Sequence, residues 1–344
     1  MTANPFKAIF SRLFRSGGGN TVALDERQRQ LLDRVIEFVV DNTDPRMRLV
    51  PHYKDKLAPG IIRAAFYLGG IIKGLPEPLE LSRDAWANDP RLNAYFAVPE
   101  DVPRVMATSA DLRAFFDDPG QRGAQEAFAL MVMEKTEHKV LGAALEDGVL
   151  RQDVARINIS FGERRIVAPA ATQIDARVEI GLRGVRRLLD VMLARIAAMQ
   201  EQATDLAEQK ALLGTKLRRL KSTGFGIEPA ADHTREIAEL EAQLAQAAKE
   251  LLEIKGNVRS IERYLEQVNE VLLAPEQHLT TSEVRLRVNR LGVKVAENST
   301  EAAQELVLTE LRLGELSAII VPVKCRRSDM PPKGSLLADA EKYL

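Results

Sequence analysis

The chain has 344 residues, of which 45% are hydrophobic, 28% are charged and 5% are aromatic. This composition is that of a folded protein and excludes a disordered or fibrous one. The 48 basic and 49 acidic residues nearly cancel, so we expect no nucleic-acid partner. No apolar run approaches the ~20 residues that cross a bilayer. Since Cys325 is the only cysteine, the sequence favours a reducing cytoplasm.

Residues 1–15 are predicted to form a basic amphipathic helix that begins at Asn4 and Pro5. The apolar residues recur on one face and the cations lie on the other. Residues 5–15 therefore contain the candidate membrane-binding residues Phe6, Lys7, Ile9, Phe10, Arg12, Leu13, Phe14 and Arg15. One interpretation places this helix on an anionic membrane surface, and the other packs its apolar face on the protein's own core. Residues 16–20, with three glycines, are predicted to be a flexible tether.

Residues 21–148 are predicted to form a helical domain of about six helices with short connections. Ser82, Asp89 and Ser109 each stand where a helix N-cap is expected. The last and longest of these helices is predicted over residues 121–145, and Gly148 follows its end.

Short strands are predicted on both sides of the central part of the chain. Residues 149–170 show the alternation of a β-hairpin with a turn at Gly162 and Glu163. Residues 282–327 show a similar alternation and are predicted to form a β-rich base, although residues 306–313 fit a helix equally well. Residues 328–344 are predicted to be a polar tail with a short helix.

Residues 171–275 are predicted to fold into a long antiparallel coiled-coil hairpin with its tip at residues 221–232. Apolar residues recur every seven positions from Val178 to Leu220, and a second such series runs from Leu182 to Leu217 with Lys210 as its polar interruption. A matching pair of series spans residues 237–272. At ~1.5 Å per residue the predicted rod is on the order of 55 to 65 Å long.

The predicted tip is a candidate partner-binding site. It carries an apolar pair flanked by cations, namely Lys216, Arg218, Arg219, Lys221, Phe225 and Ile227. An exposed apolar pair beside cations suits docking to a protein or lipid. The alternative is that Phe225 caps the hydrophobic seam and that the cations are a solvated face.

The sequence contains no assembled catalytic or metal-binding motif. The four histidines are scattered. Glu134 and His138 are predicted to share a face of one helix, which a solvated ion pair explains as well as a metal site does. Cys325 lies in a predicted strand beside Arg326 and Arg327, where a buried structural thiol is favoured over a reactive one. We therefore predict no catalytic residue, metal ion or cofactor.

The fold expected from these segments is mainly α: a helical domain, a long antiparallel coiled-coil hairpin, and a small β-rich base formed by the segments that flank the hairpin. The first hypothesis for function is a non-enzymatic scaffold or adaptor that binds protein partners through the coiled coil. We expect a homo-oligomer, held at the cytoplasmic face of a membrane by its N-terminal helix. The order strand, helical hairpin, strand is similar in layout to the periplasmic adaptor subunits of export or efflux machines, which gives the second hypothesis. The third is an enzyme with a pocket in the helical domain.

Overall fold

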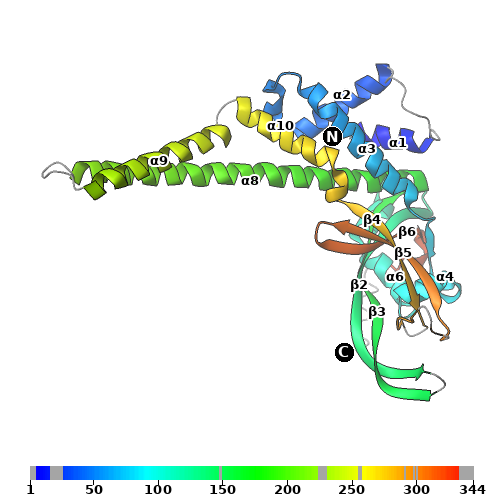
Figure 1. Ribbon diagram of the computed structural model, residues 1–344. Coiled ribbons are helices and arrows are strands. Elements are labelled where there is room, and N and C mark those ends of the chain that lie inside the picture. The colour runs from blue at the N-terminus through cyan, green and yellow to red at the C-terminus, as the bar shows by residue number, and fades with distance from the viewer. Residues whose placement is uncertain are drawn as a thin grey trace.

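A layer of helices lies across one face of a β-sheet, and one long helix extends far beyond the sheet (Figure 1). This computed structural model describes residues 5–15, 26–146, 149–223, 231–254, 258–289, 292–296, 299 and 301–332. The elements of the helical layer are α1 (Pro5–Arg15), α2 (Glu26–Asp41), the 3-10 helix η1 (Pro45–Leu49), α3 (Tyr53–Gly74), α8 (Gln173–Thr223), α9 (Ala231–Ile254) and α10 (Val258–Leu273).

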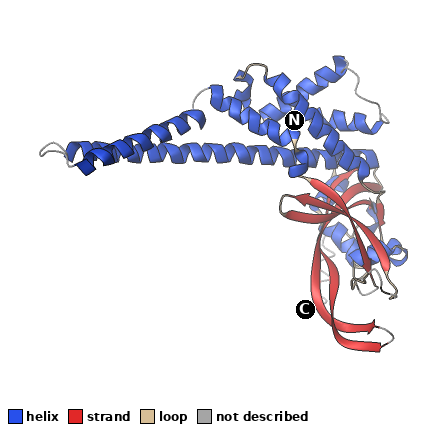
Figure 2. Ribbon diagram, viewed as in Figure 1, coloured by secondary structure: helices blue, strands red, loops and turns tan. Residues whose placement is uncertain are grey.

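The sheet has six strands, five of which follow the order β3-β2-β6-β5-β4. The sixth strand, β1, pairs in parallel with the part of β6 that lies beyond its pairing with β5. All other strand pairs are antiparallel. The strands are β1 (Leu79–Leu81), β2 (Glu126–Glu146), β3 (Val149–Ala170), β4 (Thr280–Val288), β5 (Gln304–Leu313) and β6 (Leu316–Arg326). Strands from both sides of the central helices therefore share one sheet. The C-terminal part of β2 and the N-terminal part of β3 extend beyond the rest of the sheet as a curved two-stranded ribbon (Figure 2).

Both faces of the sheet are covered. Because side chains alternate along a strand, Met131 and Ile319 face one core while the adjacent Leu130 and Ile320 face the other. The first core lies against the four short helices α4 (Arg83–Asn88), α5 (Pro90–Tyr95), α6 (Asp101–Thr108) and α7 (Ala110–Asp117). The second lies against α3 and α8. Ser82, Asp89 and Ser109 accept N-cap hydrogen bonds at the starts of α4, α5 and α7, as predicted.

Two secondary-structure predictions are wrong. Most of residues 121–145 lies in strand β2, which spans Glu126–Glu146, instead of in a helix, and residues 149–170 form the single strand β3 instead of a hairpin. Residues 127–133 of β2 are covered on both faces, so their continuous apolar run resembles a buried helix in the sequence. At Gly162 and Glu163, β3 passes through an irregularity with φ 45° at Glu163, where its register with β2 shifts, and then continues.

The predicted fold of a helical domain, a long antiparallel coiled-coil hairpin and a small base is also wrong. The segment that returns from the tip is two helices, of which α10 packs on α3 and η1 as well as on α8. Arg46 of η1 lies 5.7 Å from the ring centroid of Tyr264, and Lys56 of α3 forms a 2.5 Å ion pair with Glu262. The heptad spacing indicates an apolar face but does not specify which helix covers it. The sheet is also larger than the predicted base, because β1 and β2 come from residues 21–148.

Candidate interaction surfaces

The most extended feature of the molecule is an arm, which we define as residues 199–223 of α8 together with α9. It projects sideways from the helical layer and the sheet (Figure 1). Leu206 and Leu213 are buried in the arm together with the small residues Ala203 and Ala247, so the two helices approach closely over a thin apolar seam. An ion pair of 2.6 Å between Lys221 and Glu241 joins them near the tip. At ~1.5 Å per residue the α8 part of the arm is ~35 Å long.

The outward face of the arm has a segregated charge pattern. Glu201, Asp205 and Glu208 lie along one line of exposed residues, and Leu212 follows on that line with 57% of its surface exposed. Beyond Leu212 the exposed residues on this line are basic, namely Lys216 and Arg219. At 100° per residue all six side chains lie within about 40° of the direction of Leu212. The heptad series of apolar residues indicates only the buried seam, so it does not identify this outward face.

The predicted tip residues are only partly placed. Lys216, Arg218, Arg219 and Lys221 lie on the last turns of α8, where Lys221 is paired with Glu241 and Arg218 donates a 3.3 Å hydrogen bond to the Gly214 carbonyl. Phe225 and Ile227 lie outside the described residues. Lys210, the polar residue in the predicted seam, is exposed. The four cations thus share the end of one helix, while the apolar half of the predicted site is untested.

The N-terminal helix α1 lies on the protein's own core. Phe6 is 2% exposed and Phe10 is fully buried, and the two rings stack at 6.2 Å. Phe6 also meets Phe38 of α2 edge-on at 6.0 Å. Phe10 lies over Gly181 of α8, where the absence of a side chain leaves room for the ring. These contacts are those of the second interpretation of the sequence, in which the apolar face packs on the core.

The rest of α1 adds one contact from its polar face. Lys7 forms a 3.3 Å ion pair with Glu179 of α8, and Ile9 is partly buried. The side chains of the remaining candidate membrane-binding residues, Arg12, Leu13, Phe14 and Arg15, lie outside the described part of the structure. None of the helices in the described part has the length and apolar composition needed to cross a bilayer.

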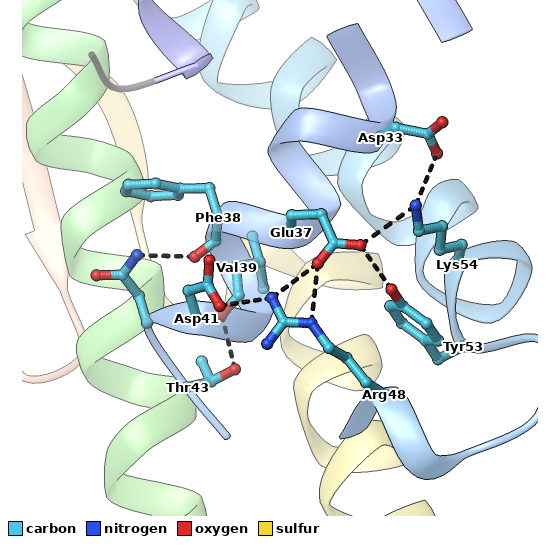
Figure 3. A network of polar contacts seen from close by, with 10 residues as sticks. Asp33, Glu37, Phe38, Val39, Asp41, Thr43, Arg48, Tyr53 and Lys54 are labelled. Atoms are coloured by element: carbon cyan, nitrogen blue, oxygen red, sulfur yellow. Dashed lines mark hydrogen bonds and ion pairs between the residues drawn. The ribbon is translucent and has the colours of Figure 1, made fainter. Parts of the chain in front are cut away.

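A network of polar contacts joins α2, η1 and α3 (Figure 3). Glu37 is its centre: Tyr53 donates a 2.5 Å hydrogen bond to its carboxylate, Arg48 donates two of 3.0 and 2.7 Å, and Lys54 lies 3.2 Å away. Arg48 also bonds to Asp41 at 2.5 Å. Burial acts to raise the pKa of Glu37, but the hydrogen bonds from Tyr53, Arg48 and Lys54 together lower it. Arg48 and Lys54 therefore form ion pairs with α2 and stabilise the packing of η1 and α3 against it.

Replacing Glu37 with Gln is expected to lower the free energy of unfolding by about 1 kcal/mol at neutral pH, a modest value because the side chain is 32% exposed. The folded-state pKa of Glu37 lies below its ordinary value of 4.5. Its stabilisation is therefore complete above that value and is lost as the pH falls through the folded-state pKa. Urea unfolding of both proteins across the acidic range should show the difference shrinking below pH 4.5. Glu266→Gln, at an exposed carboxylate of α10, is the control; an equal effect there would contradict the assignment.

The residues considered for metal binding or catalysis are either far apart or buried. Glu134 and His138 lie on strand β2, where four residues span ~13 Å, so the prediction that they share a helical face is wrong. Cys325 on β6 is fully buried, and burial raises its pKa to about 12. The thiol is therefore protonated at neutral pH and acts as a small apolar residue in the core. Among the described residues there is no group of three or more side chains arranged to hold a metal ion.

A surface hollow of about 390 Å³ lies between α4, α6 and the residues that follow β6. Ser82 and Asp329 are among its polar lining residues. The Ser82 hydroxyl already accepts a 3.0 Å hydrogen bond from the Ala85 amide as an N-cap. This hydrogen bond gives Ser82 a structural role at the start of α4. The hypothesis of an enzyme with a pocket in the helical domain gains no support here and stays a prediction.

No protein-family model, no curated protein and no solved structure matches this chain. Its function is therefore inferred from its own residues and their geometry.

Proposed function

We propose that this protein is a non-enzymatic scaffold that self-associates through its arm. The observation that carries the proposal is the outward face of the arm, where an acidic half and a basic half flank the exposed Leu212. A surface with this order of charges is complementary to itself when two copies run in opposite directions. A two-fold dimer requires self-complementarity of this kind.

The antiparallel arrangement is centred on Leu212. With the two copies of this residue in contact at the two-fold axis, Asp205 and Glu208 of one copy lie alongside Lys216 and Arg219 of the second copy. Because of the two-fold axis, this contact between acidic and basic residues occurs twice in the interface. The parallel arrangement instead places acid beside acid and base beside base, which costs free energy.

The thinness of the arm supports the same proposal. Two helices in contact bury only one side of each, and helices gain most of their stability from such packing. The buried part of the arm includes the small residues Ala203 and Ala247, which contribute little apolar area. A second arm packed on the outward face would cover Leu212 and increase the apolar area that is buried. The charges would mainly set direction and register, since exposed ion pairs contribute about 0–1 kcal/mol each.

Light scattering on two charge variants tests the proposal. Asp205→Lys/Glu208→Lys reverses the two carboxylates that would lie against the cations of the second copy, and Lys216→Glu/Arg219→Glu makes the outward face acidic throughout. We expect the unmodified chain to have the mass of a dimer, each variant alone to be monomeric, and an equal mixture of the two to form dimers again. Recovery on mixing excludes misfolding as the cause of the monomers.

Glu236→Lys/Glu266→Lys, at exposed positions on α9 and α10, is the control for net charge and should remain dimeric. A monomeric mass for the unmodified chain at high concentration would reject self-association and leave a different protein partner as the occupant of this face. Dimers that persist in both variants would reject the antiparallel arrangement.

Attachment to the cytoplasmic face of a membrane through α1 stays a prediction from the sequence, and the contacts of Phe6 and Phe10 with the core oppose it. It requires a second state, in which Phe6 and Phe10 leave the core and α1 binds anionic lipid. Lys7 would then exchange Glu179 for lipid headgroups.

A further inference from the structure

A cavity of about 320 Å³ lies between the sheet and the helices α3 and α8. This volume is at the lower end of the range of about 300–1,000 Å³ that is usual for small-molecule sites. Its walls are mainly apolar: Leu68 and Ile72 come from α3, and Leu130, Val132 and Ile320 come from the sheet. Figure 1 shows α8 crossing above the sheet in this region.

The polar part of the cavity lining is cationic. Its charged residues are Arg165 of β3 and Arg183 and Arg187 of α8, and among the described residues no carboxylate belongs to the lining. Arg183 is neutralised by a 2.6 Å ion pair with Asp111. The buried Nε of Arg187 has no hydrogen-bond partner within the described residues. Leaving a buried charged donor unpaired is costly, so this nitrogen favours an anionic acceptor.

The α8 wall of the cavity contains two glycines. Gly181 and Gly184 both line it, and a Cβ atom at Gly184 would lie 2.9 Å from the Leu68 side chain. The helix backbone thus replaces bulky side chains at this point, which brings α8 close to α3 beside the cavity. Arg187 is about one turn further along α8 than Gly184, so its guanidinium is carried by the same helix.

We propose that this cavity binds a single-chain fatty carboxylate. The alkyl chain lies among the apolar side chains, and the carboxylate accepts hydrogen bonds from the Arg187 guanidinium, with Arg165 contributing a second positive charge. A planar guanidinium matches a carboxylate in geometry as well as in charge. The apolar walls select the alkyl chain, and the arginines select an anion over a cation or a neutral alcohol.

Isothermal titration of the full chain with decanoate, kept below its micelle-forming concentration, tests the proposal. We expect saturable binding of one ligand per chain, and no binding of decyltrimethylammonium at the same concentration. From hexanoate to octanoate the affinity should rise by about fourfold per methylene group, and it should level off once the cavity is filled. Binding at many sites per chain, or equal binding of the cationic amphiphile, would overturn the proposal.

Two variants locate the site. Arg187→Gln should weaken decanoate binding by about tenfold or more, whereas Arg186→Gln, at the exposed neighbouring position on α8, should leave it unchanged. Val132→Phe should fill part of the cavity and weaken binding without changing the charge. Circular dichroism of each variant checks that the fold is retained. Equal loss of affinity in both arginine variants, or full affinity in Arg187→Gln and Val132→Phe, would show that the ligand binds elsewhere.

Discussion

Replacing Gly60 with Val is expected to destabilise the folded protein by about 3 kcal/mol. Gly60 lies on α3 where this helix crosses α10. A Cβ atom at this position would lie 2.5 Å from Asn269 Oδ1 and 2.8 Å from Leu272 Cβ. Leu272 Cβ is attached directly to the α10 backbone and cannot move without it. The two helices would therefore have to separate, exposing part of the core that they share.

The same helix provides the control. Gly70 also belongs to α3, but a Cβ atom there would meet nothing within 4 Å. Gly70→Val should leave the free energy of unfolding within about 0.5 kcal/mol of the original value, because valine is slightly better than glycine in a helix. Urea unfolding monitored by circular dichroism measures both variants. Similar stabilities for the two would mean that α3 and α10 do not cross at Gly60.

The position of α10 illustrates what the heptad pattern does and does not determine. The pattern correctly identified many of the buried residues of α8, among them Val178, Val185 and Met192, although its member Lys210 is exposed. It could not determine that α10 would be held by α3 and η1 as well as by α8. A row of apolar residues has the same spacing whichever apolar surface covers it. The contact at Gly60 depends on a residue far from α10 in the sequence, so no local pattern reports it.

The sheet illustrates a second limit of prediction from local sequence patterns. Local capping signals predicted the starts of α4, α5 and α7 because an N-cap side chain bonds to its own helix. Strand β2 has no such local signal: β3 covers one of its edges and β6 the other. Burial on both faces removed the alternation that would have identified β2 as a strand.

The two candidate sites differ in how far the sequence predicts them. The outward face of the arm can be derived from residues 201–219 alone once α8 is known to be one helix, because every member lies on that helix. The cavity cannot be derived in this way. Its lining comes from α3, α8 and the sheet, and Arg187 gains its importance only from the apolar walls of these other elements.

Replacing Phe10 with Ala is expected to lower the free energy of unfolding by about 3 kcal/mol, or by the whole docking free energy of α1 if that is smaller. Phe10 is fully buried, and its loss removes the ring that stacks on Phe6 and covers Gly181. Phe66→Ala is the control, since Phe66 is 61% exposed and its truncation should cost no more than a few tenths of a kcal/mol. Urea unfolding gives the stabilities. Trypsin digestion should cut faster after Lys7 in Phe10→Ala, because α1 leaves the core more often.

This docking free energy decides between the two interpretations of α1. A cost of about 3 kcal/mol holds α1 on the core in more than 99% of molecules, since each 1.4 kcal/mol is a tenfold ratio. Even a single myristoyl chain gives only marginal membrane binding. The intact chain should therefore co-sediment with anionic vesicles no better than a chain lacking residues 1–19, and the shortened chain should lose at least as much stability as Phe10→Ala. Strong co-sedimentation of the intact chain alone, together with a negligible effect of Phe10→Ala on unfolding, would instead establish α1 as a membrane anchor that rests only weakly on the core.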